Sequence, residues 1–192
     1  MRNNIYDKSY FTVIKDMVRN SVTSHKDKWW YLRHGSPAWK MFWKEINGAY
    51  DYLKDCDSAK DAEDALELMR LYTDSPRPEA KTLYGSVLMF NDKPWYNPDE
   101  GLRMLREGAE NAGGEGYTGA WCMFLYGLDL LTTSHGHPKN ENEARKWMEK
   151  SATQGLSDAR RFIKLYWKGS NELPFSYNRF SLTMPTIALI SS

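Results

Sequence analysis

The most regular feature of the chain is an apolar face that recurs at helical spacing. Alanines at positions 80, 120 and 159 are each followed by larger apolar residues three, four and eight positions later. Positions with these separations lie on one side of an α-helix of 3.6 residues per turn. The three sets are Ala80, Leu83, Tyr84 and Leu88; Ala120, Met123, Phe124 and Leu128; and Ala159, Phe162, Ile163 and Trp167. The same amphipathic helix is therefore expected three times, at intervals of 40 and 39 residues.

A second set of small residues interleaves with the first and predicts a partner for each of these helices. Ala65, Gly101 and Ala144 are each followed by large apolar residues three and four positions later. Small residues at these anchor positions would let neighbouring helices approach closely. Four residues before the anchors stand Asp61, Asn97 and Asn140, residue types that favour the N-cap of a helix. Each unit is therefore expected to be a pair of helices.

The spacing of the two sets predicts the fold class. The second-set anchor precedes the first-set anchor by 15 residues in two units and by 19 residues in the third. The four additional residues fall in AGGEGYTG, residues 112–119, where a loop is expected. Two-helix units with a period near 40 residues are typical of helical solenoids, so we predict an all-α chain that forms a short α/α solenoid. The alternative is an ordinary amphipathic all-α protein in which such matches arise by chance.

The third unit resembles the Sel1-like repeat, a relative of the tetratricopeptide repeat. Its residues follow the family pattern Pro-x-Asp, Ala-x-x-Trp-x-x-Lys-Ala-Ala-x-x-Gly, with Asn in place of Asp and Ser in place of the first Ala. The matching residues are Gly136, Pro138, Asn140, Ala144, Trp147, Lys150, Ser151, Ala152 and Gly155. The preceding copy is weaker, because Gly101 replaces Ala and Met104 replaces Trp, and the copy over residues 61–80 is fainter still. The resemblance covers residues 58–169 and implies a superhelix that binds other proteins on its concave face, without shared catalytic residues.

The segments outside the repeats are expected to cover the ends of the array. Apolar residues at helical spacing over 5–22 predict an N-terminal capping helix, within a cap that spans residues 1–57. Residues 28–43 carry six aromatic side chains, which could form a small core or a partner-binding patch. Residues 170–192 contain Pro174 and Pro185, so we expect an extended tail packed on the last repeat. If the tail instead occupied the groove of a second copy, a homodimer would result.

Composition narrows the kinds of partner and the compartment. The chain has 26 basic and 25 acidic residues, so its net charge of +1 predicts no general attraction to nucleic acid. Cys56 and Cys122 are too few for a disulfide scaffold and are expected to be reduced thiols in the cytoplasm. No segment is apolar for long enough to span a bilayer. A periplasmic location would follow if a signal peptide had been removed.

Candidate chemistry is sparse. His135 and His137 flank a glycine, but a proline follows and no cysteine is near, so a surface loop is expected rather than a metal site. The carboxylates cluster at predicted helix starts, as at Asp99, Glu100 and Glu141, where negative charge complements the helix dipole. No P-loop, G-x-S-x-G or H-E-x-x-H motif occurs. We therefore expect no cofactor, no metal and no enzymatic activity.

Function is predicted from the resemblance, and the partner-binding residues are predicted from the aromatic segment and from side chains that lie off the packed apolar face of the repeat helices. The expectation is a non-enzymatic protein-protein interaction module and, more narrowly, a bacterial immunity protein that neutralises a cognate secreted toxin. The alternative is an all-α hydrolase with carboxylates assembled across helices. The predicted partner-binding residues are Trp29, Trp30, Tyr31, Arg33, Trp39, Lys81, Tyr117, Trp121, Arg160, Arg161 and Lys164.

Overall fold

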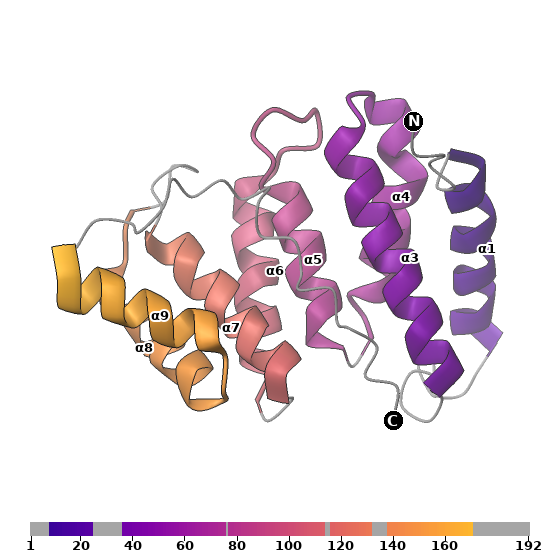
Figure 1. Cartoon of the computed structure of the whole chain (residues 1–192). Coiled ribbons are helices and arrows are strands. Elements are labelled where there is room, and N and C mark those ends of the chain that lie inside the picture. The colour runs from indigo at the N-terminus through magenta and orange to yellow at the C-terminus, as the bar shows by residue number, and fades with distance from the viewer. Residues whose placement is uncertain (1–7, 25–35, 76, 114–115, 132–137, 171–192) are drawn as a thin grey trace, which may run out of the picture.

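The regular structure of the chain is entirely helical in the part that can be described. The computed structural model describes residues 8–24, 36–75, 77–113, 116–131 and 138–170, and every regular element in these ranges is a helix (Figure 1). The predicted all-α class is therefore confirmed. No helix within these ranges is long and apolar enough to cross a membrane.

The described part of the chain contains eight α-helices and one π-helical turn. Within it, Cys56 and Cys122 form no disulfide. The elements are α1 (Lys8–Ser24), α3 (Ser36–Asp55), α4 (Ala59–Tyr72), α5 (Pro78–Leu88), α6 (Pro98–Asn111), α7 (Gly116–Leu131), α8 (Glu141–Thr153), α9 (Ser157–Leu165) and a π-helical turn, η1 (Tyr166–Ser170).

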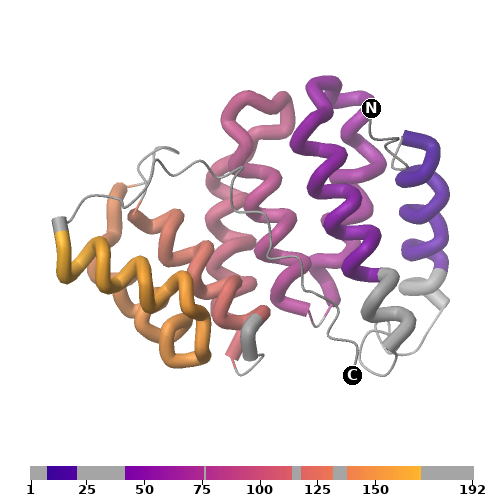
Figure 2. Tube along the Cα trace, viewed as in Figure 1, coloured from indigo at the N-terminus to yellow at the C-terminus, as the bar shows by residue number. Residues whose placement is uncertain are grey.

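The helices follow one another across the molecule in chain order, from α1 at one end to α9 at the other (Figures 1 and 2). Within this order α3 packs on α4, α5 on α6, and α7 on α8. Contacts between α3 and α5, and between α5 and α7, join successive pairs. Each helix pair therefore hides its apolar side against the pairs before and after it.

The small anchor residues are buried in this packing, and Gly101 lies where α5 and α6 approach closely. The five alanine anchors are fully buried, and Gly101 is buried as well. At α5 and α6 the approach is closest, because a Cβ atom built on Gly85 would lie 2.7 Å from the carbonyl oxygen of Gly101. A Cβ atom on Gly101 would lie 2.6 Å from Sδ of Met89. The predicted reason for small anchors, close approach of helices, is therefore confirmed at this pair.

Two of the three predicted N-caps are observed. The side chain of Asn97 accepts a hydrogen bond from the amide of Glu100 at 3.3 Å, and that of Asn140 accepts one from Glu143 at 3.2 Å. The prediction for Asp61 is wrong, because α4 begins earlier and its N-cap is Ser58. The Ser58 hydroxyl accepts from the Asp61 amide at 3.3 Å, so Asp61 lies in the first turn of the helix.

The additional residues of the middle unit are mostly helical rather than a loop. Helix α6 continues to Asn111 and α7 begins at Gly116, so four residues separate them, against three between α8 and α9. The expectation of an inserted loop over 112–119 is therefore wrong for 116–119. Packing of α7 against α6 and α8 compensates for the weak helix propensity of Gly116 and Gly119.

Helix α1 packs on the outer side of α4. It buries Phe11 and Val18, and the Phe11 ring lies 5.0 Å from the ring of Tyr52. Charged pairs line the same contact: Lys8 with Asp61 at 3.1 Å, Lys15 with Asp64, and Arg19 with Glu67. The helix expected over 5–22 is thus observed as α1, and both apolar burial and ion pairs hold it.

Candidate protein-binding surface

Two of the predicted partner-binding residues contact other helices of the chain itself. Trp121 of α7 is only 5% exposed, within a run from Trp121 to Leu131 that is buried throughout. Helices α5, α6 and α8 pack around α7, and a helix that is apolar on all sides is typical of such a central position. Lys81 of α5 forms an ion pair with Glu107 of α6 at 2.6 Å. Both side chains therefore contribute to packing between helices.

Much of the predicted aromatic patch falls outside the described residues. Trp29, Trp30, Tyr31 and Arg33 lie there, and so do His135, His137 and the tail from residue 171 onward. Trp39 lies in α3 and Tyr117 in α7, but neither side chain is among those described.

The described end of the aromatic segment belongs to the core. Phe42 is fully buried and Trp43 is half-buried, with ring centroids 5.5 Å apart. The Phe42 ring also meets Tyr72 of α4 edge to face at 5.0 Å. For these two residues the interpretation as a small core is confirmed.

The remaining predicted residues share one exposed side of the last helix. Arg160, Arg161 and Lys164 are exposed on α9, and Lys168 of η1 follows at the same helical spacing. This side lies opposite the buried residues Ala159, Phe162 and Tyr166. We call Arg160, Arg161, Lys164 and Lys168 the basic face of α9. Lys168 was not predicted as a partner-binding residue, although its position four residues after Lys164 could have indicated it.

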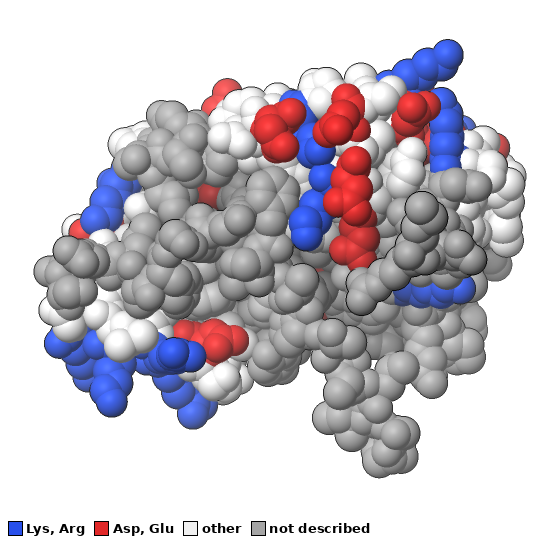
Figure 3. All heavy atoms as spheres, turned by 45° about the horizontal axis from the view of Figure 1, so that its top comes forward, with Lys and Arg blue, Asp and Glu red and all other residues white. Residues whose placement is uncertain are grey.

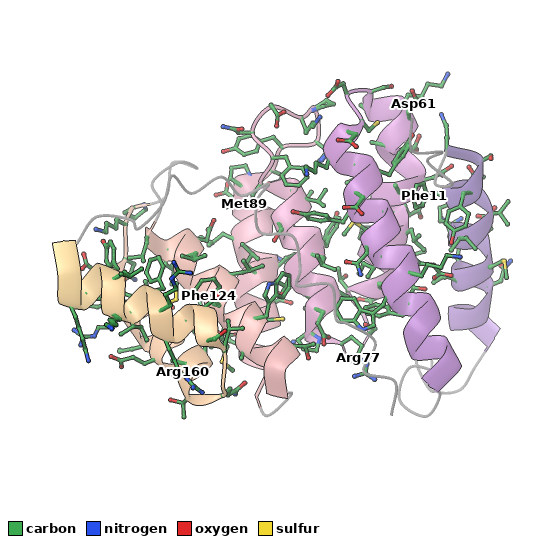
Figure 4. All side chains as sticks on the ribbon, in the orientation of Figure 1. Phe11, Asp61, Arg77, Met89, Phe124 and Arg160 are labelled. Atoms are coloured by element: carbon green, nitrogen blue, oxygen red, sulfur yellow. The ribbon has the colours of Figure 1, made fainter. Side chains whose placement is uncertain are left out.

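The basic face of α9 carries uncompensated charge. No described residue forms an ion pair with any of its four side chains; Arg160 donates only to the backbone carbonyl of Ala152, at 3.1 Å. Figure 4 shows Arg160 near the start of α9, beside the end of α8. Most other charged lysines and arginines in the described part of the chain do form ion pairs. Examples are Lys8, Lys15, Arg19, Lys81, Lys93, Arg103, Arg106, Lys139 and Arg145.

Charge is unevenly distributed along the molecule. Residues 138–170 contain eight Lys or Arg and four Asp or Glu, a net charge of +4. Residues 36–75 contain five Lys or Arg and nine Asp or Glu, a net charge of −4. In the space-filling view, Lys and Arg gather at the end of the molecule formed by α8 and α9 (Figure 3). The overall charge of +1 therefore hides a basic end formed by α8 and α9.

A cluster of aromatic rings fixes α9 and η1 to the neighbouring helices. The Phe162 ring stacks on Tyr166 at 5.4 Å and meets Phe124 of α7 at 6.1 Å. The indole Nε1 of Trp167 donates to Glu141 of α8 at 3.1 Å. These contacts pack the buried side of α9 and η1 against α7 and α8. The helix that carries the exposed cations is therefore firmly packed.

Polar contacts also hold η1 against α8. Lys139 donates to the hydroxyl of Tyr166 at 2.8 Å and pairs with Glu141 at 3.1 Å. The hydrogen bond to Tyr166 raises the pKa of Lys139, and the bond from Lys139 lowers the pKa of Glu141. Both groups are therefore charged near neutral pH, and their pairing holds η1 against the start of α8.

The opposite end of the molecule shows acidic side chains that neighbouring lysines already engage. A shallow depression at the α3–α4 junction is lined by Tyr52, Asp55, Cys56, Asp57, Ser58 and Asp61. Lys93 pairs with Asp57 at 2.6 Å, and Lys8 pairs with Asp61 at 3.1 Å. The pKa of Asp61 is lowered, chiefly by the hydrogen bond from Lys8. These carboxylates therefore hold adjacent elements together.

Glu45 of α3 has a buried carboxyl group. It is 1% exposed, and the hydroxyl of Tyr72 donates to it across the contact between α3 and α4. Burial raises the pKa of Glu45, against the opposing effect of the hydrogen bond from Tyr72. Among the described residues, no group of three or more His, Cys, Asp or Glu is placed to hold a metal ion.

Comparison with models of known protein families gives no match. No curated protein and no solved structure matches the chain. The likeness to Sel1-like repeats therefore stays a prediction that rests on the residues quoted for it.

Proposed function

We propose that the chain is a non-enzymatic protein-binding module: a short α/α solenoid of Sel1-like hairpins with α1 as its N-terminal cap. The partner protein would contact the concave side of the solenoid, with the basic face of α9 at one edge of the contact. One observation carries this proposal. The basic face of α9 is exposed and unpaired within the described residues, whereas most comparable cations elsewhere are paired inside the molecule.

The arrangement of the helices supports the same proposal. Successive pairs contact their neighbours in chain order, which is the packing expected when no single hairpin can bury its apolar side alone. Helix α1 covers the outer side of α4, as a terminal cap would. Solenoids of this kind present an extended surface to a partner.

The alternative, an all-α hydrolase, finds less support in the described carboxylates. Asp99, Glu100, Glu141 and Glu143 stand in the first turns of α6 and α8, where they complement the helix dipole. Glu45 has the raised pKa expected of a general acid, but its carboxyl group is enclosed between α3 and α4 with Tyr72. A substrate would reach it only if these helices separated. Structural roles thus explain these carboxylates.

The narrower role that we propose is a bacterial immunity protein, located in the cytoplasm or periplasm, that neutralises a cognate secreted toxin. Its support is the Sel1-like resemblance of residues 58–169. In that role the chain would form a one-to-one complex that blocks the active site of the toxin. The C-terminal segment could instead join two copies in a homodimer.

The test is to purify the chain with proteins encoded beside it and to measure binding by isothermal titration calorimetry. We expect a one-to-one complex with a dissociation constant below micromolar, and loss of toxin activity in the complex. The double variant Arg161→Glu, Lys164→Glu should bind at least about tenfold more weakly, since charges at an interface edge change association strongly. No complex at micromolar concentration, or turnover of a substrate by the isolated chain, would contradict the proposal.

A further inference from the structure

We infer that the basic face of α9 binds an acidic α-helix of the partner protein, one whose carboxylates recur every three or four residues along one side. This inference rests on the proposed protein-binding function and specifies the chemistry of the partner. It starts from the spacing of the four exposed cations.

The cations are spaced to match a helix of opposite charge. Arg160, Lys164 and Lys168 follow one another at intervals of four residues, and Arg161 lies beside them. With a rise of about 1.5 Å per residue, Arg160 and Lys164 lie about 6 Å apart along α9, and Lys168 continues the row in η1. Carboxylates placed three or four residues apart on a second helix repeat at the same interval, so several pairs can form at once. A partner surface without that period would meet only one or two of the cations.

The molecule already contains a contact of this kind. Cations of α1 meet carboxylates of α4 in three successive pairs: Lys8 with Asp61, Lys15 with Asp64, and Arg19 with Glu67. The three carboxylates stand three residues apart on α4. Apolar side chains of α1, Phe11 and Val18, fill the space between the helices. The chain thus shows that two of its helices pack stably through a row of cations against a row of carboxylates.

A second copy of the chain is a poorer partner for the basic face of α9 than a different protein is. The acidic row of α4 is not available to a second copy, because cations of α1 already pair with it. Asp57, at the nearby α3–α4 junction, is paired with Lys93 at 2.6 Å. The carboxylates that the basic face of α9 requires must therefore come from a different protein.

Nucleic acid and membranes are also poorer fits. Single-stranded nucleic acid binds where exposed aromatic rings stack on bases, but Phe162 and Tyr166 are buried and Trp167 is half-buried. A membrane-surface helix needs a free apolar side, whereas the apolar side of α9 packs on α8. A protein helix can also contact Leu165, which is 39% exposed beside the cations.

The experiment uses the full-length chain and two synthetic peptides. The first is an alanine-based helix with glutamates at every fourth position on one side, and the second has the same composition with the glutamates distributed around the helix. Fluorescence anisotropy at low salt is expected to show that the aligned peptide binds at least about fivefold more tightly. The variant Arg161→Glu, Lys164→Glu should weaken binding of the aligned peptide at least about tenfold.

Two controls separate a local site from general charge and from misfolding. Lys44→Glu, Lys60→Glu reverses two exposed cations that form no ion pair with a described residue, and it should change affinity less than about twofold. Lys164→Arg keeps the charge on α9 and should bind like the unaltered chain. Circular dichroism checks that each variant keeps its helices.

Several outcomes would overturn the inference. These are equal affinity for the two peptides, equal loss in the α9 and control variants, or tighter binding of an oligonucleotide or of anionic phosphatidylserine vesicles than of the aligned peptide. Self-association that the α9 variant abolishes would favour a second copy instead. If a natural partner binds but tolerates the α9 variant, this inference fails while the protein-binding function stands. If no protein partner binds at all, the proposed function fails as well.

Discussion

Individual glycines set the distance between α5 and α6. The Cβ atom that alanine would add at Gly85 lies 2.7 Å from the backbone oxygen of Gly101, and backbone cannot move aside as a side chain can. We expect Gly85→Ala to lower the free energy of unfolding by about 1–3 kcal/mol, measured by urea titration. The matched control is Gly113→Ala, because nothing lies within 4 Å of a Cβ atom there. Equal effects of the two substitutions would show that close approach is not the reason for Gly85.

The buried Glu45 should make stability depend on pH in a definite direction. Burial raises its folded-state pKa above the ordinary value of 4.5, so the folded chain holds this proton more tightly than the unfolded chain does. The resulting stabilisation is fully present below pH 4.5 and is lost as the pH rises through the folded-state pKa. Glu45→Gln keeps an oxygen to accept from the Tyr72 hydroxyl but removes the titration. Urea titrations at several pH values should therefore show Glu45→Gln gaining stability relative to the unaltered chain as pH rises, and an unchanged difference would contradict this account.

Hydrophobic periodicity predicted which residues would be buried better than it predicted polar roles. The recurring apolar side correctly indicated Ala80, Ala120 and Ala159, because burial of a helix stripe is a local property of the sequence. By contrast, Ser58 was missed as an N-cap and Asp61 was chosen instead. Both residue types cap helices well, and only the position of the first helical turn decides between them. Glu45 gave no signal at all, because its burial depends on Tyr72 of another helix.

At the scale of elements, the contact between α1 and α4 should be sensitive to acid and to salt. The hydrogen bond from Lys15 lowers the pKa of Asp64, so this pair stabilises the fold above the ordinary carboxyl pKa of 3.8 and ceases to do so as the pH falls through the lowered value. Lys15→Ala should increase amide hydrogen exchange in α1 roughly threefold, the effect expected for one ion pair near the surface.

A second variant tests whether that effect belongs to the contact between helices. Arg106→Ala removes a cation that is more exposed than Lys15 and whose partner, Glu110, lies four residues away on the same helix. This variant should leave exchange in α1 unchanged. If both variants affect α1 equally, net charge rather than the row of pairs determines its docking.

Connections between elements were predicted less well than the elements themselves. The glycines of residues 112–119 indicated a loop by composition, yet α7 begins at Gly116, because contacts with α6 and α8 outweigh a weak intrinsic preference. The same contacts placed Trp121 inside the molecule, although its aromatic character made it a candidate for partner binding. Arg160, Arg161 and Lys164 did prove exposed, because the side opposite an apolar stripe is normally solvated.

For the whole molecule, composition hid the distribution of charge. Near-equal totals of acidic and basic residues predicted no general attraction to nucleic acid, but they do not reveal that basic residues are concentrated at the end formed by α8 and α9. The charged residues can be read from the sequence, but which of them remain without an ion pair depends on the fold. The cations of α1 form ion pairs with carboxylates of α4, whereas the four cations of the basic face of α9 form no ion pair with a described residue. This difference depends on which helices become neighbours, which periodicity alone does not specify.

The order of the helices leads to a last prediction, about how the molecule unfolds. If each hairpin touches only its neighbours, damage at one end should stay near that end, as in other repeat proteins. Phe162 is buried where α9 meets Phe124 of α7, so Phe162→Ala should cost about 3–5 kcal/mol locally. Hydrogen exchange should then increase strongly in α8 and α9, less in α7, and hardly in α1 and α4. Gly85→Ala, in the middle of the array, should instead increase exchange on both sides of α5. A uniform increase in all helices with either variant would mean that the chain unfolds as one globular bundle, and the solenoid on which the proposed binding surface depends would have to be abandoned.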